Sequence, residues 1–267
     1  MKFKGKNIQI GKNVKLGKNV RIGDNTTIYD NVEIAENTII CNDCVIGEPL
    51  ADYYTNKKYK NPGTKIGENS LIRSHSIIYA STETGTNFTT GHRVVIREKS
   101  KFGNYCSIGT MSDIQGFVKF GDYCRLHSSV HISQYSEVGN FVFIYPFVVF
   151  TNDPHPPSTI WKGPEIGDYT QIAVSSVINS GVKIGTNCLV AANSFIKSDM
   201  LDYSVFAGTP AKFISDIREI KSKQIKGMHY PWMKNFSKGM PWEKIGFEKW
   251  SLTLPSPKER NKRKRNG

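Results

Sequence analysis

Hydrophobic residues recur along this chain with a period of six. Within residues 10–46, 66–150 and 166–196, every sixth residue, counted from the first of each range, is almost always Ile, Leu, Val or Phe. We call these positions anchors. Only Thr84 and Thr90 among them are not hydrophobic. A period of six cannot keep one face of an α-helix apolar, so the pattern excludes helix over these ranges.

A second restricted position lies four residues after each anchor. It holds a small residue, mostly Val, Ser, Thr or Cys, and Phe88 and Met200 are the exceptions. A β-branched anchor with a small partner suits short strands joined by tight turns. Three such strands close a triangular coil of 18 residues, with large and small side chains stacked inside it. The sequence therefore predicts an all-β solenoid over about residues 8–214.

This repeat resembles that of the hexapeptide-repeat family, and the resemblance covers the whole predicted solenoid. It implies a left-handed parallel β-helix. The handedness comes from the family alone, because parallel crossovers are in general overwhelmingly right-handed. We expect a β-helix domain over residues 1–214, a C-terminal helical and aromatic extension over 215–257, and a disordered basic tail over 258–267.

Several segments depart from the repeat. Residues 47–65 hold three Tyr and four Lys, and residues 151–165 hold four Pro among polar side chains. Loops that leave a solenoid tend to gather on a binding face, and proline stiffens them. Residues 215–227 predict a short helix. The segment after it, with Trp232, Trp242 and Trp250, contains too many aromatic residues to be disordered filler.

The distribution of charge argues against a nucleic-acid partner. The 267 residues carry a net charge of +13, but six Lys without an acid lie in residues 1–18 and six basic residues with one acid in 258–267. Residues 19–214, the predicted solenoid, carry 16 basic and 18 acidic groups, so they have no basic excess to form a binding face. The longest apolar run, residues 141–150, is too short for a membrane helix, which needs roughly 20 residues.

The N-terminal sequence and the positions of the cysteines predict a cytoplasmic protein. The basic N-terminus has no apolar stretch behind it, so we expect no secretory signal and no membrane partner. Four Cys occupy the small inward position and a fifth lies beside an anchor, which predicts core filler in a reducing compartment. They are Cys44, Cys106, Cys124 and Cys188, with Cys41 beside the anchor.

Stacking points to a candidate site. With 18 residues per coil, residues j and j+18 lie one above the other, about 4.8 Å apart. Asp113 therefore stacks beneath His131, and a carboxylate beside an imidazole raises its basicity, as a general base requires. Because His131 is three residues from Gln134, we expect two polar columns to converge at one edge beside the 151–165 loop. The columns are Glu98, Gly116, Gln134 and Asn152, and His92, Thr110 and Ser128.

Three sequence segments resemble one particular group of enzymes within this family. They are GTMSDIQG (109–116), YCRLHSSVHI (123–132) and FTNDPHPPS (150–158), and they resemble acyl-CoA-dependent N-acyltransferases of nucleotide-linked amino-deoxy sugars. The family's closing signature matches Gly208, Pro210, Ala211 and Lys212. The resemblance implies acetyl-CoA or another short acyl-CoA as cosubstrate and a dTDP- or UDP-linked 3-amino or 4-amino sugar as acceptor. It further implies a homotrimer with sites between subunits and a role in surface polysaccharide (O-antigen) biosynthesis.

Stacking and resemblance together give the candidate residues. Gln134 lies where family members often have a catalytic His, and Asn152 and Asp153 match an Asn-Asp pair of the amino-sugar subgroup. The departing thiolate of CoA could itself accept the proton of the amine. We expect Asp113, His131, Gln134, Asn152 and Asp153 to be catalytic, Arg73, His92, Arg97, His127 and His155 to bind substrate, and Ala173, Ala191, Lys197 and Lys212 to bind the cofactor, without a metal.

Three other functional classes stay open. A zinc hydratase of the carbonic anhydrase kind needs three converging His. His127 and His131 are available, but His75 and His92 lie two to three coils away. A non-catalytic scaffold is the second alternative, which the polar columns and the Pro-rich loop disfavour. An O-acetyltransferase or an amino-acid N-acyltransferase on the same fold is the third.

Overall fold

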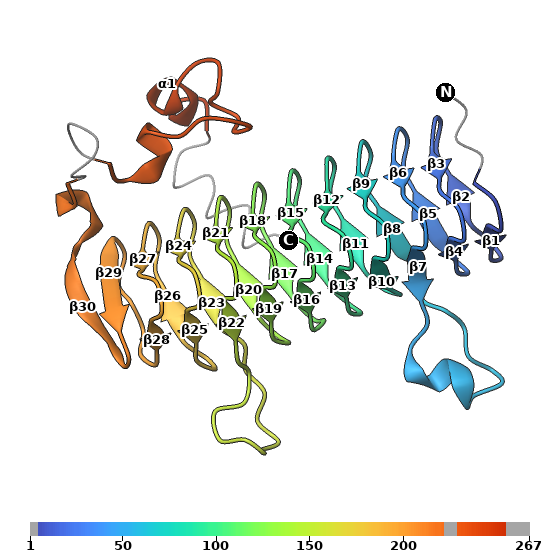
Figure 1. Cartoon of the computed structure of the whole chain (residues 1–267), viewed down its shortest axis with the longest axis horizontal. Coiled ribbons are helices and arrows are strands. Elements are labelled where there is room, and N and C mark those ends of the chain that lie inside the picture. The colour runs from blue at the N-terminus through green and yellow to red at the C-terminus, as the bar shows by residue number, and fades with distance from the viewer. Residues whose placement is uncertain (1–4, 222–228, 255–267) are drawn as a thin grey trace. The chain divides into compact units, whose positions relative to one another are not determined.

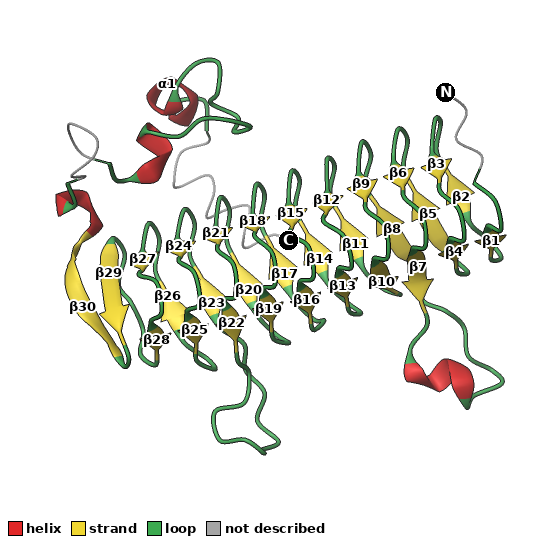
Figure 2. Cartoon of the chain, in the orientation of Figure 1, coloured by secondary structure: helices red, strands yellow, loops and turns green. Residues whose placement is uncertain are grey.

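The computed structural model describes residues 5–221 and 229–254. The chain divides into two compact units, residues 1–214 and 215–267. The first unit is a long coil of short strands, and each turn of the coil contributes one strand to each of three sheets (Figure 1). Almost every residue of this unit lies either in such a strand or in the tight turn between two of them (Figure 2).

We name the sheets A, B and C in the order in which each coil passes through them. Sheet A contains β3 (Arg21–Ile22), β6 (Ile39–Ile40), β9 (Leu71–Ile72), β12 (Thr89–Thr90), β15 (Ser107–Ile108), β18 (Arg125–Leu126), β21 (Phe143–Ile144), β24 (Gln171–Ile172), β27 (Leu189–Val190), β29 (Ser204–Gly208) and β30 (Ala211–Asp216). Sheet B contains β1 (Gln9–Ile10), β4 (Thr27–Ile28), β7 (Val45–Glu48), β10 (Ile77–Tyr79), β13 (Val95–Ile96), β16 (Asp113–Ile114), β19 (His131–Ile132), β22 (Val149–Phe150), β25 (Val177–Ile178) and β28 (Phe195–Ile196). Sheet C contains β2 (Lys15–Leu16), β5 (Val32–Ile34), β8 (Thr64–Ile66), β11 (Glu83–Thr84), β14 (Lys101–Phe102), β17 (Lys119–Phe120), β20 (Glu137–Val138), β23 (Glu165–Ile166) and β26 (Lys183–Ile184).

The anchors form the interior of the coil. Ile96, Ile114 and Ile132 follow one another through sheet B at intervals of 18 residues, and their side chains are fully buried. Neighbouring coils pair in parallel, so each anchor stacks on the anchor of the coil below it. The predicted all-β solenoid with two extruded loops is confirmed, and its form is the one expected of a left-handed parallel β-helix.

Each turn contains one residue with a positive φ, three residues after the anchor. Asn and Asp tolerate this left-handed conformation, and they occupy it through the first coils. There the side-chain amides also form ladders, as where Nδ2 of Asn7 donates to Oδ1 of Asn25 at 3.2 Å. Further along the chain, bulky residues such as Tyr105, Met111 and Phe147 take the same position, with φ of 58°, 59° and 61°. These turns therefore hold large side chains outward at a conformational cost.

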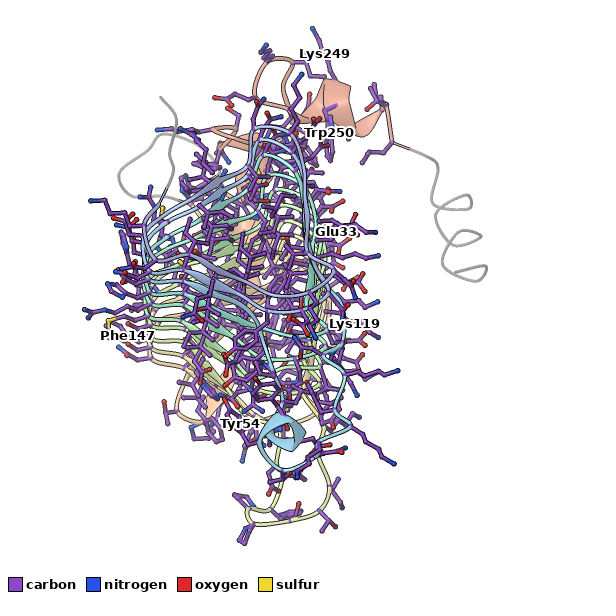
Figure 3. The ribbon with its side chains drawn as sticks, turned by 90° about the vertical axis from the view of Figure 1, so that its right-hand side faces the viewer. Glu33, Tyr54, Lys119, Phe147, Lys249 and Trp250 are labelled. Atoms are coloured by element: carbon purple, nitrogen blue, oxygen red, sulfur yellow. The ribbon has the colours of Figure 1, made fainter. Side chains whose placement is uncertain are left out.

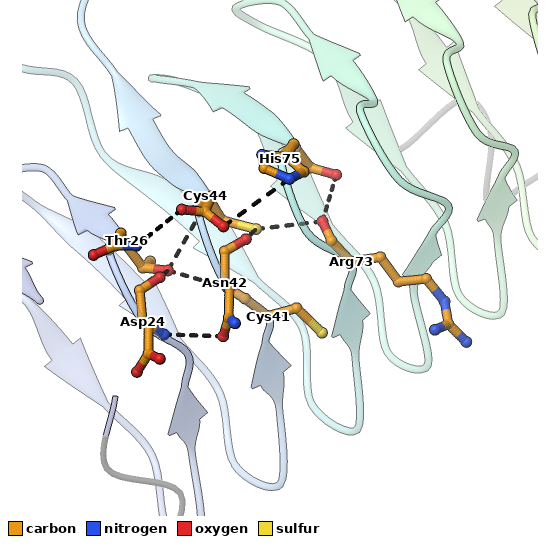
Figure 4. A network of polar contacts seen from close by, with 10 residues as sticks. Asp24, Thr26, Cys41, Asn42, Cys44, Arg73 and His75 are labelled. Carbon is orange, nitrogen blue, oxygen red and sulfur yellow. Dashed lines mark hydrogen bonds and ion pairs between the residues drawn. The ribbon is translucent and has the colours of Figure 1, made fainter. Parts of the chain in front are cut away.

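The small fourth position ties the turns of successive coils together (Figure 4). Thr26 Oγ1 donates to the carbonyl oxygen of Cys41 at 3.0 Å, and Cys44 Sγ donates to that of Arg73 at 3.3 Å. Only a short side chain can stay inside the corner and reach the next turn. A buried hydroxyl or thiol needs such a partner, which explains why Ser, Thr and Cys alternate with Val at this position.

The cysteines behave as core filler. The four inward Cys are free and fully buried, and Cys41 is half-buried. Burial raises the pKa of Cys44 and of Cys188 to about 11, so both thiols stay protonated and act as donors to backbone carbonyls.

The outer surfaces of sheets B and C differ sharply. Outward positions of sheet C are charged throughout, and four Lys–Glu pairs link successive strands: Lys15–Glu33, Lys101–Glu83, Lys119–Glu137 and Lys183–Glu165. Such exposed pairs suit a surface that faces water. Outward positions of sheet B from β7 onward are Val45, Ile77, Val95, Asp113, His131, Val149, Val177 and Phe195. From β7 onward the outer face of sheet B is thus largely apolar, and its polar interruption is one carboxylate and one imidazole.

Both extruded loops leave the corner between sheets B and C. The first follows β7 and contains the 3-10 helix η1 (Ala51–Tyr54), and the second follows β22. Seen along the coil axis, both loops project from the corner where Tyr54 lies (Figure 3). Glu33 and Lys119 lie along the charged side of the prism in the same view, and Phe147 marks another corner.

The second unit differs from the expectation of a helix over residues 215–227. Strand β30 continues to Asp216, and a single 3-10 turn, η2 (Ile217–Glu219), follows it. The Asp216 carboxylate accepts the backbone N–H of Arg218 at 2.8 Å, which caps this turn. Residues 222–228, and the predicted tail over 258–267, lie outside the described residues.

Aromatic side chains form the interior of the second unit. Trp242 is 1% exposed, and its ring centre lies 5.8 Å from that of Trp232 and 5.0 Å from that of Trp250. Its Nε1–H donates to the carbonyl of Phe236 at 2.9 Å. The segments that carry these rings include η3 (Trp232–Lys234) and helix α1 (Phe247–Ser251). The aromatic segment thus packs against itself.

One coil exchanges its large and small positions. Its anchors are Thr84 and Thr90, and the fourth position between them is Phe88, which is fully buried. The Phe88 ring centre lies 5.1 Å from that of Phe102 in the next coil. The large ring therefore fills the volume that two Thr anchors leave in this layer.

We predict that Phe88→Ala lowers the free energy of unfolding by about 3–5 kcal/mol, because it leaves a cavity between two small anchors. Thr90→Ile should also destabilise, since it overpacks the wild-type layer. Phe88→Ala combined with Thr90→Ile should be less destabilised than the sum of the two single effects, because the larger anchor fills part of the cavity. Urea unfolding of each variant, with exposed Lys12→Ala as control, measures this coupling, and strict additivity would contradict the exchange.

Candidate active site

Asp113 and His131 meet on the outer face of sheet B. They begin the adjacent strands β16 and β19, whose register places one directly opposite the other, as their spacing of 18 residues predicts. Nδ1 of His131 lies 3.2 Å from Oδ2 of Asp113. Their side chains are 39% and 41% exposed, so the pair is open to a ligand and yet partly shielded from water.

Gln115 holds the same carboxylate from a second side. Its Nε2 donates to Oδ2 of Asp113 at 2.6 Å. The hydrogen bond with His131 lowers the pKa of Asp113, and that from Gln115 and the nearby charge of Arg97 lower it further, although partial burial opposes them. Asp113 is therefore a fixed anion. Sequence reasoning missed Gln115, although its place directly after the anchor Ile114 puts it at the edge of sheet B.

Arg97 supplies a fixed cation one coil away. Its Nε and Nη2 donate to the two carboxylate oxygens of Glu98 at 2.8 and 3.1 Å, and Glu98 is only 8% exposed. The hydrogen bond with Glu98 is the largest cause that raises the pKa of Arg97. The guanidinium carbon lies 5.0 Å from the ring centre of Tyr79. Arg97 is thus held at the corner between sheets B and C.

The two predicted polar columns do not converge at one edge, and that expectation is wrong. His92 and Ser128 lie in turns between sheets A and B, whereas Gln134 and Asn152 lie in turns between sheets B and C. Three residues are half of one six-residue repeat, so the step from His131 to Gln134 leads from the sheet to the next corner. The columns flank sheet B, and the Asp113–His131 pair lies between them.

The predicted substrate-binding residues lie on both sides of sheet B. Arg73 and His92 are exposed at the corner between sheets A and B. His127 occupies the same corner, with its ring stacked 4.9 Å from that of Tyr145. Partial desolvation of His127, with the charge of Arg125 as a smaller cause, lowers the pKa of its imidazole. Arg97 lies instead at the opposite corner.

The predicted cofactor-binding residues also lie on both sides of sheet B. Ala173 and Ala191 follow β24 and β27, so they lie one above the other at the corner between sheets A and B. Thr209 Oγ1 donates to the carbonyl of Asn193 at 3.1 Å, which places the start of β30, with exposed Lys212, near that corner. Lys197 follows β28 and lies across sheet B from them.

The second loop is ordered around Asp153. Its carboxylate accepts the backbone N–H of His155 at 2.9 Å, the backbone N–H of Ser158 at 2.7 Å and the Ser158 hydroxyl at 2.7 Å. These bonds, led by that of the Ser158 hydroxyl, lower the pKa of Asp153. The carbonyl of Asn152 accepts the backbone N–H of Lys162 at 2.7 Å and closes the base of the loop. Asp153 therefore shapes the loop, and His155 is exposed on it.

Comparison with known proteins agrees with the repeat. The family model described as bacterial transferase hexapeptide (six repeats) matches residues 163–198. Residues 163–198 thus carry the hexapeptide repeat of this family model, and the same period of six builds the rest of the coil. None of the curated proteins matches it in sequence.

Solved structures of similar form include a UDP-N-acetylglucosamine acyltransferase from Arabidopsis, with a TM-score of 0.54 and 15% identity over 78% of this chain and 72% of that one. This likeness shows the fold. A UDP-N-acetylglucosamine O-acyltransferase from Moraxella catarrhalis has a TM-score of 0.45 and 20% identity, over 82% and 72% of the chains. Perosamine N-acetyltransferase from Caulobacter crescentus, in complex with CoA and GDP-perosamine, has a TM-score of 0.36 and 19% identity, over 55% and 57%.

The described residues contain neither a metal-binding group of side chains nor a membrane-spanning helix. Within residues 5–221 and 229–254, no group of three or more His, Cys, Asp or Glu side chains is arranged to hold a metal ion. No helix in these same ranges is long and apolar enough to cross a membrane.

We predict that Asp153→Ala loosens the second loop without unfolding the coil, because all three hydrogen bonds to the carboxylate lie within the loop. Limited proteolysis should cleave residues 151–163 several-fold faster, while the melting temperature stays within about 2 °C. His155→Ala is the matched control, since His155 donates through its backbone. Equal cleavage rates in Asp153→Ala and the wild type would contradict this role.

Proposed function

We propose that the protein is an acyl-CoA-dependent N-acyltransferase that acylates the amino group of a nucleotide-linked amino-deoxy sugar. The observation that carries this proposal is the Asp113–His131 pair with Gln115, open to ligand on the largely apolar outer face of sheet B. The sequence strings around these residues resemble that group of enzymes. The fold-level likeness to an acyltransferase of UDP-N-acetylglucosamine is compatible with it but assigns no substrate.

The reaction needs a base, an oriented amine and an acyl donor. The ammonium group of the sugar is attracted by the Asp113 carboxylate and passes one proton to His131. The free amine then attacks the thioester carbonyl, the carbon–sulfur bond breaks, and the thiolate of CoA takes up the second proton, which the nitrogen loses as it becomes an amide. Asp113 stays ionised throughout, and stabilises the imidazolium that forms.

Positioning supplies much of the rate. Holding an amine and a thioester in reactive geometry is worth roughly 7–11 kcal/mol. The second loop leaves the corner between sheets B and C directly after β22. Its Asn152 amide is proposed as an oxyanion donor, typically worth about 3 kcal/mol. Gln134 lies at the same corner and is proposed to bind the sugar rather than to accept a proton.

Acyl-CoA is proposed to lie along the corner between sheets A and B. Ala173 and Ala191 leave space there for the pantetheine to approach the backbone, and Lys212 provides a cation for its phosphates. The acyl donor and the sugar would then reach Asp113 and His131 from opposite sides of sheet B. A homotrimer with sites between subunits, acting in the cytoplasm in surface polysaccharide biosynthesis, belongs to the same proposal.

A panel of nucleotide-linked 3-amino and 4-amino sugars, incubated with acetyl-CoA, tests the proposed function. Release of free CoA thiol with formation of an acetamido sugar supports it. Release only with acceptors that carry a hydroxyl in place of the amine would favour O-acylation instead. Absence of thiol release with every amino sugar and short acyl-CoA would refute it.

We predict that His131→Asn lowers kcat by about 10²–10⁴-fold, because a general base is lost. The hydrogen bond with His131 lowers the pKa of Asp113 and keeps this carboxylate ionised, and a general base must be unprotonated to accept the amine proton, so the rate should fall in acid. This fall in rate at acidic pH should disappear in His131→Asn and persist in Asp113→Asn. Asp113→Asn should lower kcat by a larger factor than it weakens binding of the sugar. A His131→Asn profile equal to the wild type would leave the CoA thiolate as the base.

We predict that Lys212→Ala raises the Michaelis constant for acyl-CoA by several-fold and leaves that for the sugar unchanged. An exposed cation near a phosphate contributes to binding through its charge alone. Lys212→Arg should therefore keep the wild-type Michaelis constant for acyl-CoA. Lys119→Ala, an exposed lysine on sheet C, is the matched control. A change in the constant for the sugar instead would contradict this placement of the cofactor.

A further inference from the structure

A continuous series of contacts runs along the corner between sheets B and C, from the first loop to Asp113. Tyr54 donates its hydroxyl to Oε1 of Glu48 at 3.3 Å, and Glu48 pairs with Tyr79 of the next coil. The Tyr79 ring lies beneath the guanidinium of Arg97, at 5.0 Å. Arg97 in turn lies one coil before Gln115, which holds Asp113.

This edge has the length of an extended ligand. In sheet B, three ladder steps separate β7, from which the first loop leaves, and β16, which carries Asp113, a distance of roughly 14 Å. Each step presents a different chemistry: aromatic rings at the loop, a guanidinium in the middle and the carboxylate–imidazole pair at the end. A nucleotide-linked amino sugar has its base, its diphosphate and its amine in the same order.

The first loop is rigid, unlike a solvated insertion. Asn61 is 8% exposed, and its Nδ2 donates to the carbonyl of Gly47 at 2.8 Å. Its Oδ1 accepts the hydroxyl of Tyr59 at 2.9 Å, and the Tyr59 oxygen accepts the backbone N–H of Leu50 at 3.0 Å. Asn31 Nδ2 donates to the carbonyl of Asn61 at 2.7 Å, which ties the loop to the coil.

Two rings on this rigid loop are exposed. Tyr53 packs edge to face on Tyr29 and Tyr59, at 6.2 and 5.8 Å between ring centres, yet remains 49% exposed. Tyr54 is 70% exposed. Every nucleobase has a π-face, so exposed and preordered rings are suited to stacking a base of any kind.

Arg97 suits a diphosphate. Glu98 accepts hydrogen bonds from Nε and Nη2, which fixes the guanidinium plane, while Nη1 makes no hydrogen bond to Glu98 and lies on the opposite edge. Arginine is always charged and recognises phosphate oxygens through its fork of N–H groups. The first loop adds exposed Lys57 and Lys58 to the same end of the prism, which favours an anion there.

We propose that this edge binds the nucleoside diphosphate of the acceptor, with the base on Tyr54 and Tyr53 and the diphosphate at Arg97. The proposal rests on the proposed function for the reaction at the far end of the edge. It adds a direction: the nucleotide lies toward the first loop, and the amine lies at Asp113 and His131. The corner of Ala173 and Ala191 is left for the acyl donor.

The test uses the full-length protein and titrates it with UDP and with dTDP, neither of which carries a sugar. Tyr54→Ala should weaken binding of both by about tenfold, the ordinary effect of losing one stacked ring. Tyr54→Phe keeps the ring and should bind as the wild type does. Tyr105→Ala, which removes an exposed tyrosine at the corner between sheets C and A, is the matched control.

Kinetics then separate this inference from the proposed function. Tyr54→Ala should raise the Michaelis constant for the nucleotide-linked amino sugar about tenfold, and leave kcat and the constant for acyl-CoA unchanged. With an amino-sugar 1-phosphate, which lacks the nucleoside, Tyr54→Ala and the wild type should not differ. If the wild type acylates nucleotide-linked sugars and Tyr54→Ala keeps wild-type binding and kinetics, the nucleotide subsite is overturned while the proposed function stands. If the wild type acylates no amino sugar, both are overturned.

Discussion

The closure of each coil in 18 residues is the constraint on which the rest of this structure depends. A strand of two residues makes few hydrogen bonds by itself, so it persists only because the strands of the coils above and below pair with it in register. The register in turn requires a large inward anchor, a short side chain that bonds the next turn, and one left-handed residue in every turn. Side chains 18 residues apart are thereby brought into contact, and this brings Asp113 to His131.

The same constraint leaves the outward positions free to differ between sheets. Sheet C uses them for Lys–Glu ladders that face water, and sheet B uses them for aliphatic side chains around one carboxylate–imidazole pair. The loops break the register without cost to the interior, because the coil resumes in the same phase after each of them. Both leave from the corner next to sheet B. An apolar, partly shielded face bounded by a rigid loop is where charged groups act most strongly on a ligand.

The interior and the register could be predicted from the sequence, because the period of six determines both. The opposition of Asp113 and His131 followed from the same arithmetic. The edge on which each polar column lies was predicted wrongly, since the repeat looks alike on all three sides of the triangle and only the phase of each residue within the coil separates them. Gln115 and the tyrosines of the first loop were missed as site residues, because their places depend on loop packing and on individual hydrogen bonds. Of the helix expected over residues 215–227, the described part forms the end of β30 and a single 3-10 turn, η2, instead.

The central claim is that sheet B, between its two corners, is the face on which the amine meets the thioester. A crystal structure of the protein with CoA and a nucleotide-linked amino sugar tests it most directly. The account predicts the sugar nitrogen within hydrogen-bonding distance of Asp113 or His131, roughly 2.6–3.2 Å, with CoA along the corner between sheets A and B. A sugar bound over sheet C, or an amine beyond the reach of both side chains while CoA is in place, would contradict it.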